Sequence, residues 1–250
     1  IIMKLNINYL KSSFGENLAY SHEENGSKTS VFFFGGYASD MTGTKATALS
    51  QWCEKNNYNF IRFDYSGHGK SEGNFEDGGI TKWSSEATEV LKSFSNEKNI
   101  VIGSSMGGWI SLIVSLRNLN LISALIGIAS APDFVVGEWN RLSDEQKAQI
   151  KNDGKIIINW DKYNDDYTIT YKFLKDGMNN MLLNSAINVD CPIRLLHGRL
   201  DQVVSYETSE KIIEKITSKN KKLTIIEDGD HSLSRESDLQ LLFDNIRELS

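Results

Sequence analysis

The stretch "NIVIGSSMGG", residues 99–108, joins an apolar run to a helical pattern through closely spaced glycines. Within it, residues 103–107 fit the pattern G-x-S-x-G, with Ser105 at the centre. A serine in this pattern lies on a sharp turn between a strand and a helix, and the turn holds its hydroxyl clear of the sheet. The strand is expected over 99–105 and the helix over 106–118. The stretch therefore predicts a nucleophilic serine, with a plain serine in a strand-to-helix loop as the alternative.

The rest of the chain repeats this alternation of strand and helix. Apolar runs predict further strands over 31–36, 59–64, 121–131, 192–198 and 222–228. Helical spacing of apolar residues predicts helices over 44–56, 80–94, 205–218 and 238–249. Strands that are apolar throughout are typical of a parallel sheet covered by helices on both faces. We therefore expect an α/β fold with a mostly parallel central sheet, and one domain over 1–250.

Residues 133–188 interrupt this rhythm. They are polar, with helical stretches and scattered aromatic residues, so we expect a small helical insertion that packs over the sheet as a cap. Its residues Met178, Met181 and Leu182 are expected to line an apolar substrate pocket over Ser105. The alternative is that these side chains only pack the insertion onto the sheet.

A serine hydroxyl is a weak nucleophile at neutral pH and needs a general base. His231 lies in "EDGDHSLS", directly after the last strand and before the last helix, and is the candidate. His197 lies inside an apolar strand, where a packed or hydrogen-bonded role is expected. His68 lies in the turn within residues 61–73, and His22 lies in an N-terminal region with no nearby motif. The order serine, acid, histidine along the chain is the order expected of this serine turn.

The base in turn needs a carboxylate that orients it. Asp201, in "HGRLDQVVS", follows the predicted strand 192–198, so its loop should reach the same edge of the sheet as the serine turn. Asp133, after the strand 121–131, is the rival, and a loop cap or a helix N-terminal anion is the structural alternative for Asp201.

An acyl-transfer site also needs N–H donors for the oxyanion. The backbone N–H of Met106, the residue after the nucleophile, is one candidate. The second is the backbone N–H of Tyr37, in the loop "GGYASDMTG" after the first apolar strand. Gly35 and Gly36 would let this loop approach the acyl carbonyl, although an ordinary glycine turn is the alternative.

One further motif resembles a nucleotide-binding loop, and the composition argues against nucleic-acid and membrane partners. "DYSGHGKSEG", residues 64–73, ends like a phosphate-binding P-loop, but Asp64 occupies the place of its first glycine, so we expect no nucleotide. A net charge of −6 argues against nucleic acid, and no apolar run reaches membrane-spanning length. Cys53 and Cys191 have no metal-ligand spacing and suit a reducing compartment. Acyl transfer by a serine, a histidine and an acid needs no metal or cofactor, so neither is expected.

Taken together, these stretches give the chain a clear resemblance. "GGYASDMTGTKA", "IRFDYSGHGKSEG", "GSSMGGW", "CPIRLLHG" and "DHSLSRESDLQLL" are similar to the α/β-hydrolases, and in particular to the mitochondrial acyl-protein thioesterase and acyl-glucuronide esterase branch. The resemblance implies an α/β-hydrolase fold, with Ser105, Asp201 and His231 as the triad. Many relatives carry His-Gly where this chain has Gly35-Gly36. The mitochondrial relatives carry a presequence, which we expect this chain not to have.

The expected function is hydrolysis of carboxylic esters or thioesters, on small molecules or acylated proteins, through an acyl-enzyme. The alternatives are a small aminopeptidase-like hydrolase and a non-catalytic binding protein with the same fold. We expect a monomer or a dimer in a bacterial-type cytoplasm, or in the mitochondrial matrix if a presequence has been removed.

Overall fold

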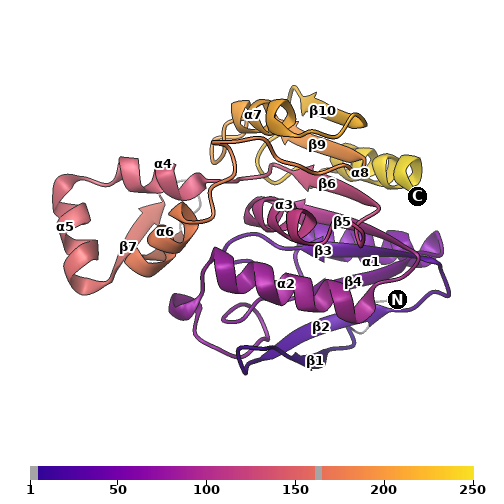
Figure 1. The fold of residues 1–250 in the computed structure, drawn as a ribbon, viewed down its shortest axis with the longest axis horizontal. Coiled ribbons are helices and arrows are strands. Elements are labelled where there is room, and N and C mark those ends of the chain that lie inside the picture. The colour runs from indigo at the N-terminus through magenta and orange to yellow at the C-terminus, as the bar shows by residue number, and fades with distance from the viewer. Residues whose placement is uncertain (1–4, 161–164) are drawn as a thin grey trace.

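The computed structural model describes residues 5–160 and 165–250 (Figure 1). Its centre is an eight-stranded sheet with the strand order β1-β2-β4-β3-β5-β6-β9-β10. The strands are β1 (Asn8–Lys11), β2 (Asn17–Glu23), β3 (Thr29–Phe34), β4 (Asn59–Phe63), β5 (Lys98–Ser104), β6 (Ala124–Ile128), β9 (Ile193–Gly198) and β10 (Lys221–Ile226). From β4 to β10 every neighbouring pair is parallel, which confirms the mostly parallel sheet predicted from the apolar runs.

Helices cover both faces of the sheet (Figure 1). They are α1 (Thr44–Lys55), α2 (Ile80–Phe94), α3 (Met106–Arg117), α7 (Glu207–Lys215) and α8 (Glu236–Leu249). Alternate residues of β3 show why both faces need cover: Val31 and Phe33 pack with α1 and α8, whereas Phe32 and Phe34 pack with α2 and α3. Successive strand side chains point to opposite faces, so a strand that is apolar throughout must be covered twice.

The N-terminal strands β1 and β2 form an antiparallel edge that the sequence did not predict. Their sequences "NYLK" and "NLAYSHE" lack a continuous apolar run, because one side of this edge reaches solvent. Half-exposed edge strands carry a weaker periodic signal than buried central strands.

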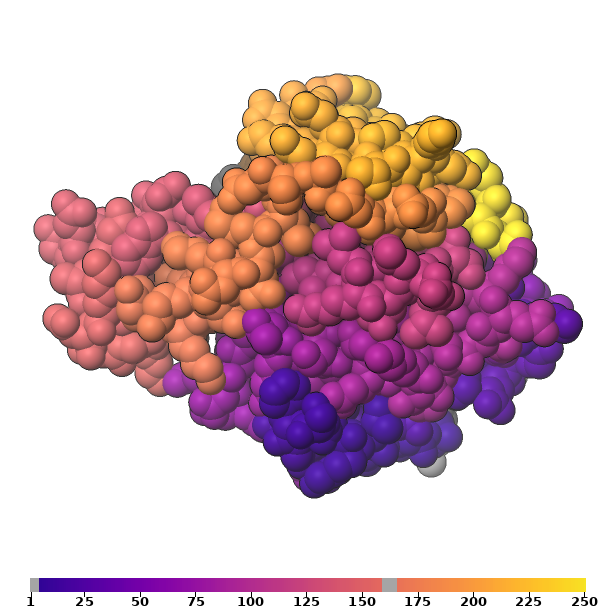
Figure 2. Space-filling view, in the orientation of Figure 1, coloured from indigo at the N-terminus to yellow at the C-terminus, as the bar shows by residue number. Residues whose placement is uncertain are grey.

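The inserted segment, residues 133–188, projects as a lobe beside the sheet (Figures 1 and 2). It holds α4 (Phe134–Arg141), α5 (Asp144–Asp153), β7 (Lys155–Trp160), β8 (Asp165–Thr170) and α6 (Tyr171–Met178). The expectation of a helical insertion was therefore incomplete, since β7 and β8 pair as an antiparallel two-stranded sheet. The β-branched residues in "KIIINW" and "DDYTIT" favour strands, with Ile156 and Ile169 buried as register partners.

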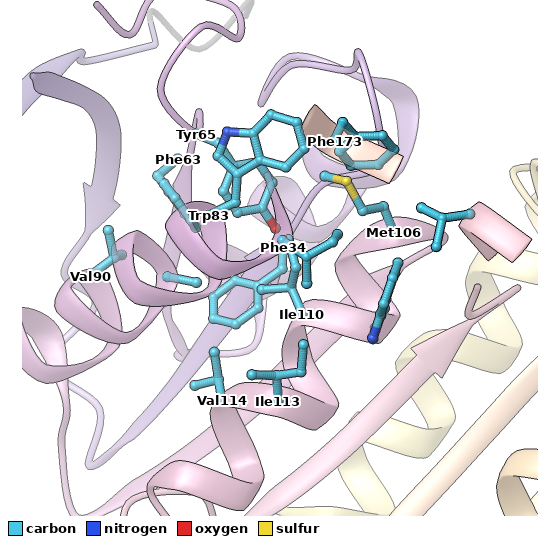
Figure 3. Close-up of a cluster of buried hydrophobic side chains, with 14 of the residues drawn as sticks. Phe34, Phe63, Tyr65, Trp83, Val90, Met106, Ile110, Ile113, Val114 and Phe173 are labelled. Carbon is cyan, nitrogen blue, oxygen red and sulfur yellow. The ribbon is translucent and has the colours of Figure 1, made fainter. Parts of the chain in front are cut away.

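A single apolar core joins the inserted segment to the sheet (Figure 3). Phe173 of α6 lies against Trp83 of α2, with the ring centroids 5.8 Å apart, and against Tyr37 at 4.9 Å. Met106, at the start of α3, lies in the same buried cluster. These contacts hold the segment next to the edge of the sheet where β3 and β5 end.

No helix within residues 5–160 and 165–250 combines the length and the apolar character that a bilayer span requires.

Candidate active site

Ser105 lies at the turn between β5 and α3. Its φ of 54° places it in the left-handed region, which residues with a Cβ rarely adopt. Two glycines leave room for this turn. A Cβ on Gly103 would lie 2.3 Å from the carbonyl oxygen of Gly107, and a Cβ on Gly107 would lie 2.1 Å from the carbonyl oxygen of Phe34. The Ser105 N–H donates to the carbonyl of Ile128 on the adjacent strand, so the strained turn is tied to the sheet.

His231 lies in the loop between β10 and α8, with its ring facing Ser105. The His231 Nε2 lies 3.1 Å from the Ser105 Oγ, and its Nδ1 lies 2.7 Å from Oδ2 of Asp201. Because a carboxylate only accepts hydrogen bonds, Nδ1 carries the proton of the neutral ring, and Nε2 accepts from the serine hydroxyl. The fold thus brings together three residues that are far apart in the sequence.

Asp201 follows β9, and none of its side chain is exposed. Its Oδ1 accepts hydrogen bonds from the N–H groups of Val203 and Val204, at 2.8 and 2.9 Å. Its Oδ2 accepts from His231 and also from His197, whose Nε2 lies 3.1 Å away. Burial alone would raise the pKa of Asp201, but the hydrogen bonds from the two histidines hold this pKa well below its ordinary value. Asp201 is therefore an anion fixed by donors on both oxygens.

The rival acid has a different place in the molecule. Asp133 is the N-cap residue of α4, and its two carboxylate oxygens accept from the backbone N–H groups of Leu182 and Leu183, at 2.8 and 2.9 Å. These bonds fasten the end of the inserted segment to its beginning. The His231 Nδ1 donates its hydrogen bond to Asp201, not to Asp133.

The two N–H groups expected at the oxyanion lie on either side of Ser105. Met106 is the first residue of α3, so its N–H is one of the helix donors that have no partner within the helix. On the other side, the loop after β3 passes close enough that a Cβ on Gly36 would lie 3.5 Å from the Ser105 Cβ. Tyr37 follows at once, and its phenol is anchored by donation to the carbonyl of Thr168 at 2.8 Å.

His68, in the loop after β4, also holds the loop that contains Tyr37. The Ala38 N–H donates to the His68 Nε2 at 3.3 Å, and the His68 Nδ1 faces the carbonyl of Ser66. Burial lowers the pKa of His68 to about 4, so the ring is neutral near pH 7 and its Nε2 is free to accept. Ala38 has a φ of 55°, which is a strained conformation for alanine that this hydrogen bond helps to maintain.

A cavity of about 470 Å³ opens in front of Ser105 and His231. This volume is within the range of sites that hold small-molecule ligands. The sheet domain contributes apolar wall residues such as Phe33, Val203 and Val204, and the inserted segment contributes Phe134, Glu138, Arg141 and Tyr167. Glu138 accepts hydrogen bonds from Arg141 at 2.5 Å and from the Tyr167 hydroxyl at 2.9 Å, so these three residues form a polar cluster in the cavity wall.

The structure corrects the expected pocket lining. Met178, Met181 and Leu182 are not among the described residues that line the cavity. Met178 and Leu182 instead pack against the hydrophobic core, which is the structural alternative that the sequence left open. The segment turns a different part of itself, α4 and β8, toward Ser105. Spacing along the chain could not reveal this choice, because it depends on how the segment folds back over the sheet.

Nowhere in residues 5–160 and 165–250 do three or more His, Cys, Asp or Glu side chains gather in a group that could hold a metal ion. Cys53 is buried and Cys191 is half-buried, and both are free thiols.

The sequence of this chain is similar to those of known hydrolases. Residues 25–161 and 159–238 match the hydrolase family model described as "Serine aminopeptidase, S33". The mitochondrial palmitoyl-protein thioesterase ABHD10 of Rattus norvegicus is 35% identical over 248 residues, which cover 98% of this chain and 83% of that protein.

Two solved structures have the same architecture over nearly their whole length. A putative hydrolase from Agrobacterium vitis S4 superposes with a TM-score of 0.92 at 32% identity, covering 98% of this chain and 99% of the other. The α/β-hydrolase domain-containing protein 10 from mouse superposes with a TM-score of 0.90 at 34% identity, covering 98% of each chain. The chain therefore belongs to the α/β-hydrolase family, in the group that includes the ABHD10 proteins.

Proposed function

We propose that the protein hydrolyses carboxylic esters or thioesters through an acyl-enzyme formed on Ser105. The observation that carries this proposal is the continuous hydrogen-bond chain from Ser105 through His231 to Asp201, at 3.1 and 2.7 Å, facing a cavity. His231 takes the proton of the Ser105 hydroxyl as the oxygen attacks the acyl carbonyl, and Asp201 stabilises the imidazolium that forms. His231 then gives this proton to the departing alcohol or thiol.

The second half of the reaction uses the same groups. A water molecule gives a proton to His231 and attacks the acyl-Ser105 ester, and the released proton returns to the Ser105 oxygen as the acid product leaves. In both halves the N–H groups of Met106 and Tyr37 stabilise the tetrahedral oxyanion. Such preorganised donors contribute several kcal/mol, about 3 to 4 for a single donor, because they act where water is excluded.

We infer the substrate class from the cavity and from the relatives. The ABHD10 relatives are named palmitoyl-protein thioesterases, and an apolar wall next to Ser105 suits an acyl chain. We propose that the inserted segment acts as a cap that selects this chain through Phe134 and its neighbours. The leaving group is then a small alcohol or thiol, or a cysteine thiol of an acylated protein.

The compartment is also a proposal. The relatives are named mitochondrial, whereas this chain has the composition expected of a cytoplasmic protein, with two free cysteines. We propose the cytoplasm, or the mitochondrial matrix, in keeping with relatives that are named mitochondrial. The chemistry proposed for Ser105 is the same in either place.

Active-site labelling tests the assignment of the nucleophile. A fluorophosphonate should label the wild type and should not label Ser105→Ala, whose hydrolytic activity should fall at least about 10³-fold. Ser115→Ala is a matched control, because Ser115 lies in α3 and its hydroxyl donates to the carbonyl of Ser111, away from the cavity. Labelling that persists in Ser105→Ala would remove Ser105 as the nucleophile.

A substrate panel separates the remaining alternatives. Acyl esters, acyl thioesters and aminoacyl anilides should be compared on purified protein, and turnover of the first two classes is expected. Preferred turnover of the anilides would favour an aminopeptidase, in keeping with the family model's description. A protein that takes the label but turns over none of the three classes would have to use a different acyl donor.

A further inference from the structure

His197 is a buried histidine that the acyl-transfer steps above do not use. It lies near the end of β9, with 0% of its side chain exposed, between the triad carboxylate and helix α7. Its Nε2 lies 3.1 Å from Oδ2 of Asp201 and 3.0 Å from the carbonyl oxygen of Val204. Its Nδ1 lies 2.6 Å from the hydroxyl of Ser209 on α7. One ring nitrogen therefore faces the loop that carries the acid, and the other faces helix α7.

These contacts determine which ring nitrogen of His197 carries a proton. Nε2 faces two groups that can only accept, the Asp201 carboxylate and the Val204 carbonyl, so Nε2 must be a donor. The neutral ring then accepts at Nδ1, and the Ser209 hydroxyl can rotate to donate to it. Ser209, itself buried, thus keeps the Nε2 proton pointed at Asp201.

Two histidines, His231 and His197, donate hydrogen bonds to the same oxygen of Asp201, Oδ2. His231 contacts both Asp201 and Ser105, whereas His197 contacts Asp201 from the opposite side of the hydrogen-bond chain. A donor on the same oxygen restricts the carboxylate's rotation and takes up part of its negative charge. Both effects reach His231 through the atom that His231 itself binds.

We infer that His197 is a positioning residue that orients the Asp201 carboxylate and limits how strongly it holds a proton on His231. This inference rests on the proposed function, because it assigns His197 a role in that same hydrogen-bond chain. Ser209 contributes to this role, because its hydrogen bond to Nδ1 selects the tautomer of the His197 ring. A purely structural role would require only that the space at the end of β9 be filled.

The two roles differ in how activity depends on pH. If His197 is replaced by a residue without a donor, the charge of Asp201 Oδ2 is shared among fewer partners, and the positively charged form of His231 is favoured. Because His231 must be neutral to accept the Ser105 proton, the rising limb of activity should move to higher pH. The other charged groups at this edge, Asp40, Lys45, Glu138, Arg141 and Asp230, are unchanged in each variant below.

The test compares His197→Leu, His197→Gln, Ser209→Ala and, as a packing control, Leu195→Val. Leu195 lies two residues before His197 on the same face of β9 and is fully packed, so its variant disturbs the strand without removing a donor. The readout is the rate of fluorophosphonate labelling of Ser105 from pH 5 to 9, which needs no knowledge of the natural substrate. Thermal midpoints show which variants remain folded.

For His197→Leu, the pH midpoint of labelling should rise by about half a unit or more, and the plateau rate should fall about tenfold, the effect of one hydrogen bond. His197→Gln should restore the wild-type midpoint, since its amide N–H can replace the Nε2 donor. Ser209→Ala should give a smaller shift in the same direction. With any ester that the enzyme turns over, the loss should appear in kcat and not in KM.

The failures are distinguishable. A wild type that takes no label at all would overturn the proposed function, and this inference with it. If the wild type is labelled but His197→Leu has the same pH midpoint as Leu195→Val, the positioning role is wrong and the proposed function stands. Failure of His197→Gln to restore the midpoint, in a protein with wild-type thermal stability, would also overturn the inference.

Discussion

The carboxylate of Asp64 accepts hydrogen bonds from the backbone N–H groups of Met41 and Lys70, at 2.7 and 2.8 Å. One buried side chain thereby joins the loop after β3 to the loop after β4. The Tyr65 hydroxyl adds a longer contact to the carbonyl of Gly35, at 3.4 Å. The loop after β4 therefore helps to position the backbone of Tyr37 near Ser105. It affects the site only through the loop after β3.

The same carboxylate explains why Gly69-Lys70-Ser71 resembles a P-loop without the space for a phosphate. A Cβ on Gly69 would lie 2.1 Å from Asp64 Oδ2, so the backbone wraps tightly around the protein's own anion. In a P-loop, such backbone N–H groups surround the phosphates instead. The internal carboxylate occupies the equivalent space and would repel a second anion.

We therefore predict that the protein does not bind nucleotides. Isothermal titration with ATP and Mg²⁺ should show no binding heat at ligand concentrations up to about millimolar, where a site of −4 kcal/mol would be detected. GTP provides the matched control for base identity, since a P-loop would respond to the shared triphosphate. Saturable binding of either nucleotide at micromolar concentration would contradict the prediction.

The two candidate acids should respond differently to the same substitution. Asp201→Asn should lower kcat by about 10⁴-fold with the fold intact, because an amide at this position favours the wrong tautomer of His231. Asp133→Asn should instead lower stability, by about 1 to 3 kcal/mol, because one of its two bonds to the N–H groups of Leu182 and Leu183 is lost. Urea unfolding and steady-state kinetics on both variants separate the two effects. A larger kcat loss in Asp133→Asn would reverse the assignment.

Acyl-chain preference should depend on Phe134 and not on Met181. Each buried methylene contributes about 0.8 kcal/mol, so kcat/KM should rise up to about fourfold per CH₂ until the cavity is full. Phe134→Leu enlarges the cavity, because a smaller side chain replaces Phe134 in its wall. The chain length at which kcat/KM stops rising should therefore increase. Met181→Gln is the control, because Met181 lies outside the cavity lining and its profile should match the wild type. A profile that is flat from two to sixteen carbons, or that shifts equally in both variants, would remove the inserted segment from chain selection.

The sequence predicted the parts of this fold that leave a local pattern. The buried strands β3 and β5 contain continuous apolar runs, over 31–34 and 100–102, and the serine turn needs glycines at fixed offsets from Ser105. Asp201 and His231 could be named because parallel strands bring their loops to one edge of the sheet. Each of these signals lies within a few residues of the feature that it predicts.

The features that the sequence did not predict depend on contacts between distant segments. His197 reads as one more residue of an apolar strand, and only the fold shows that its ring faces Asp201 and Ser209. Similarly, Phe134 and Tyr167 reach the cavity because the inserted segment folds back over the sheet. One local feature of the sequence indicated the contact between His197 and Asp201: in "HGRLD", His197 stands four residues before Asp201.

Glu86 is a buried carboxyl on α2 that gives the fold its own pH dependence. It is 0% exposed, and its Oε2 accepts a hydrogen bond from the Ser66 N–H at 2.9 Å. Among the described residues, its Oε1 has no hydrogen-bond partner. Burial raises the pKa of Glu86 from 4.5 to about 7, and the bond from Ser66 opposes this only in part. The folded state therefore binds the Glu86 proton more tightly than the unfolded chain does.

This difference sets the sign of the expected pH effect. Below about pH 4.5 the Glu86 carboxyl is protonated in both the folded and the unfolded state, so the stability that the folded state gains by binding this proton more tightly is fully present. This stability is lost as the pH rises through 7. Glu86→Gln removes the titrating group, so the variant should gain stability over the wild type between pH 5 and 8, by up to about 3 kcal/mol. Urea unfolding at both pH values measures this gain, and Glu89→Gln controls for the loss of one negative charge from the same helix. Wild-type and Glu86→Gln curves that stay parallel from pH 5 to 8 would show that Glu86 has the same proton affinity in the folded and unfolded states.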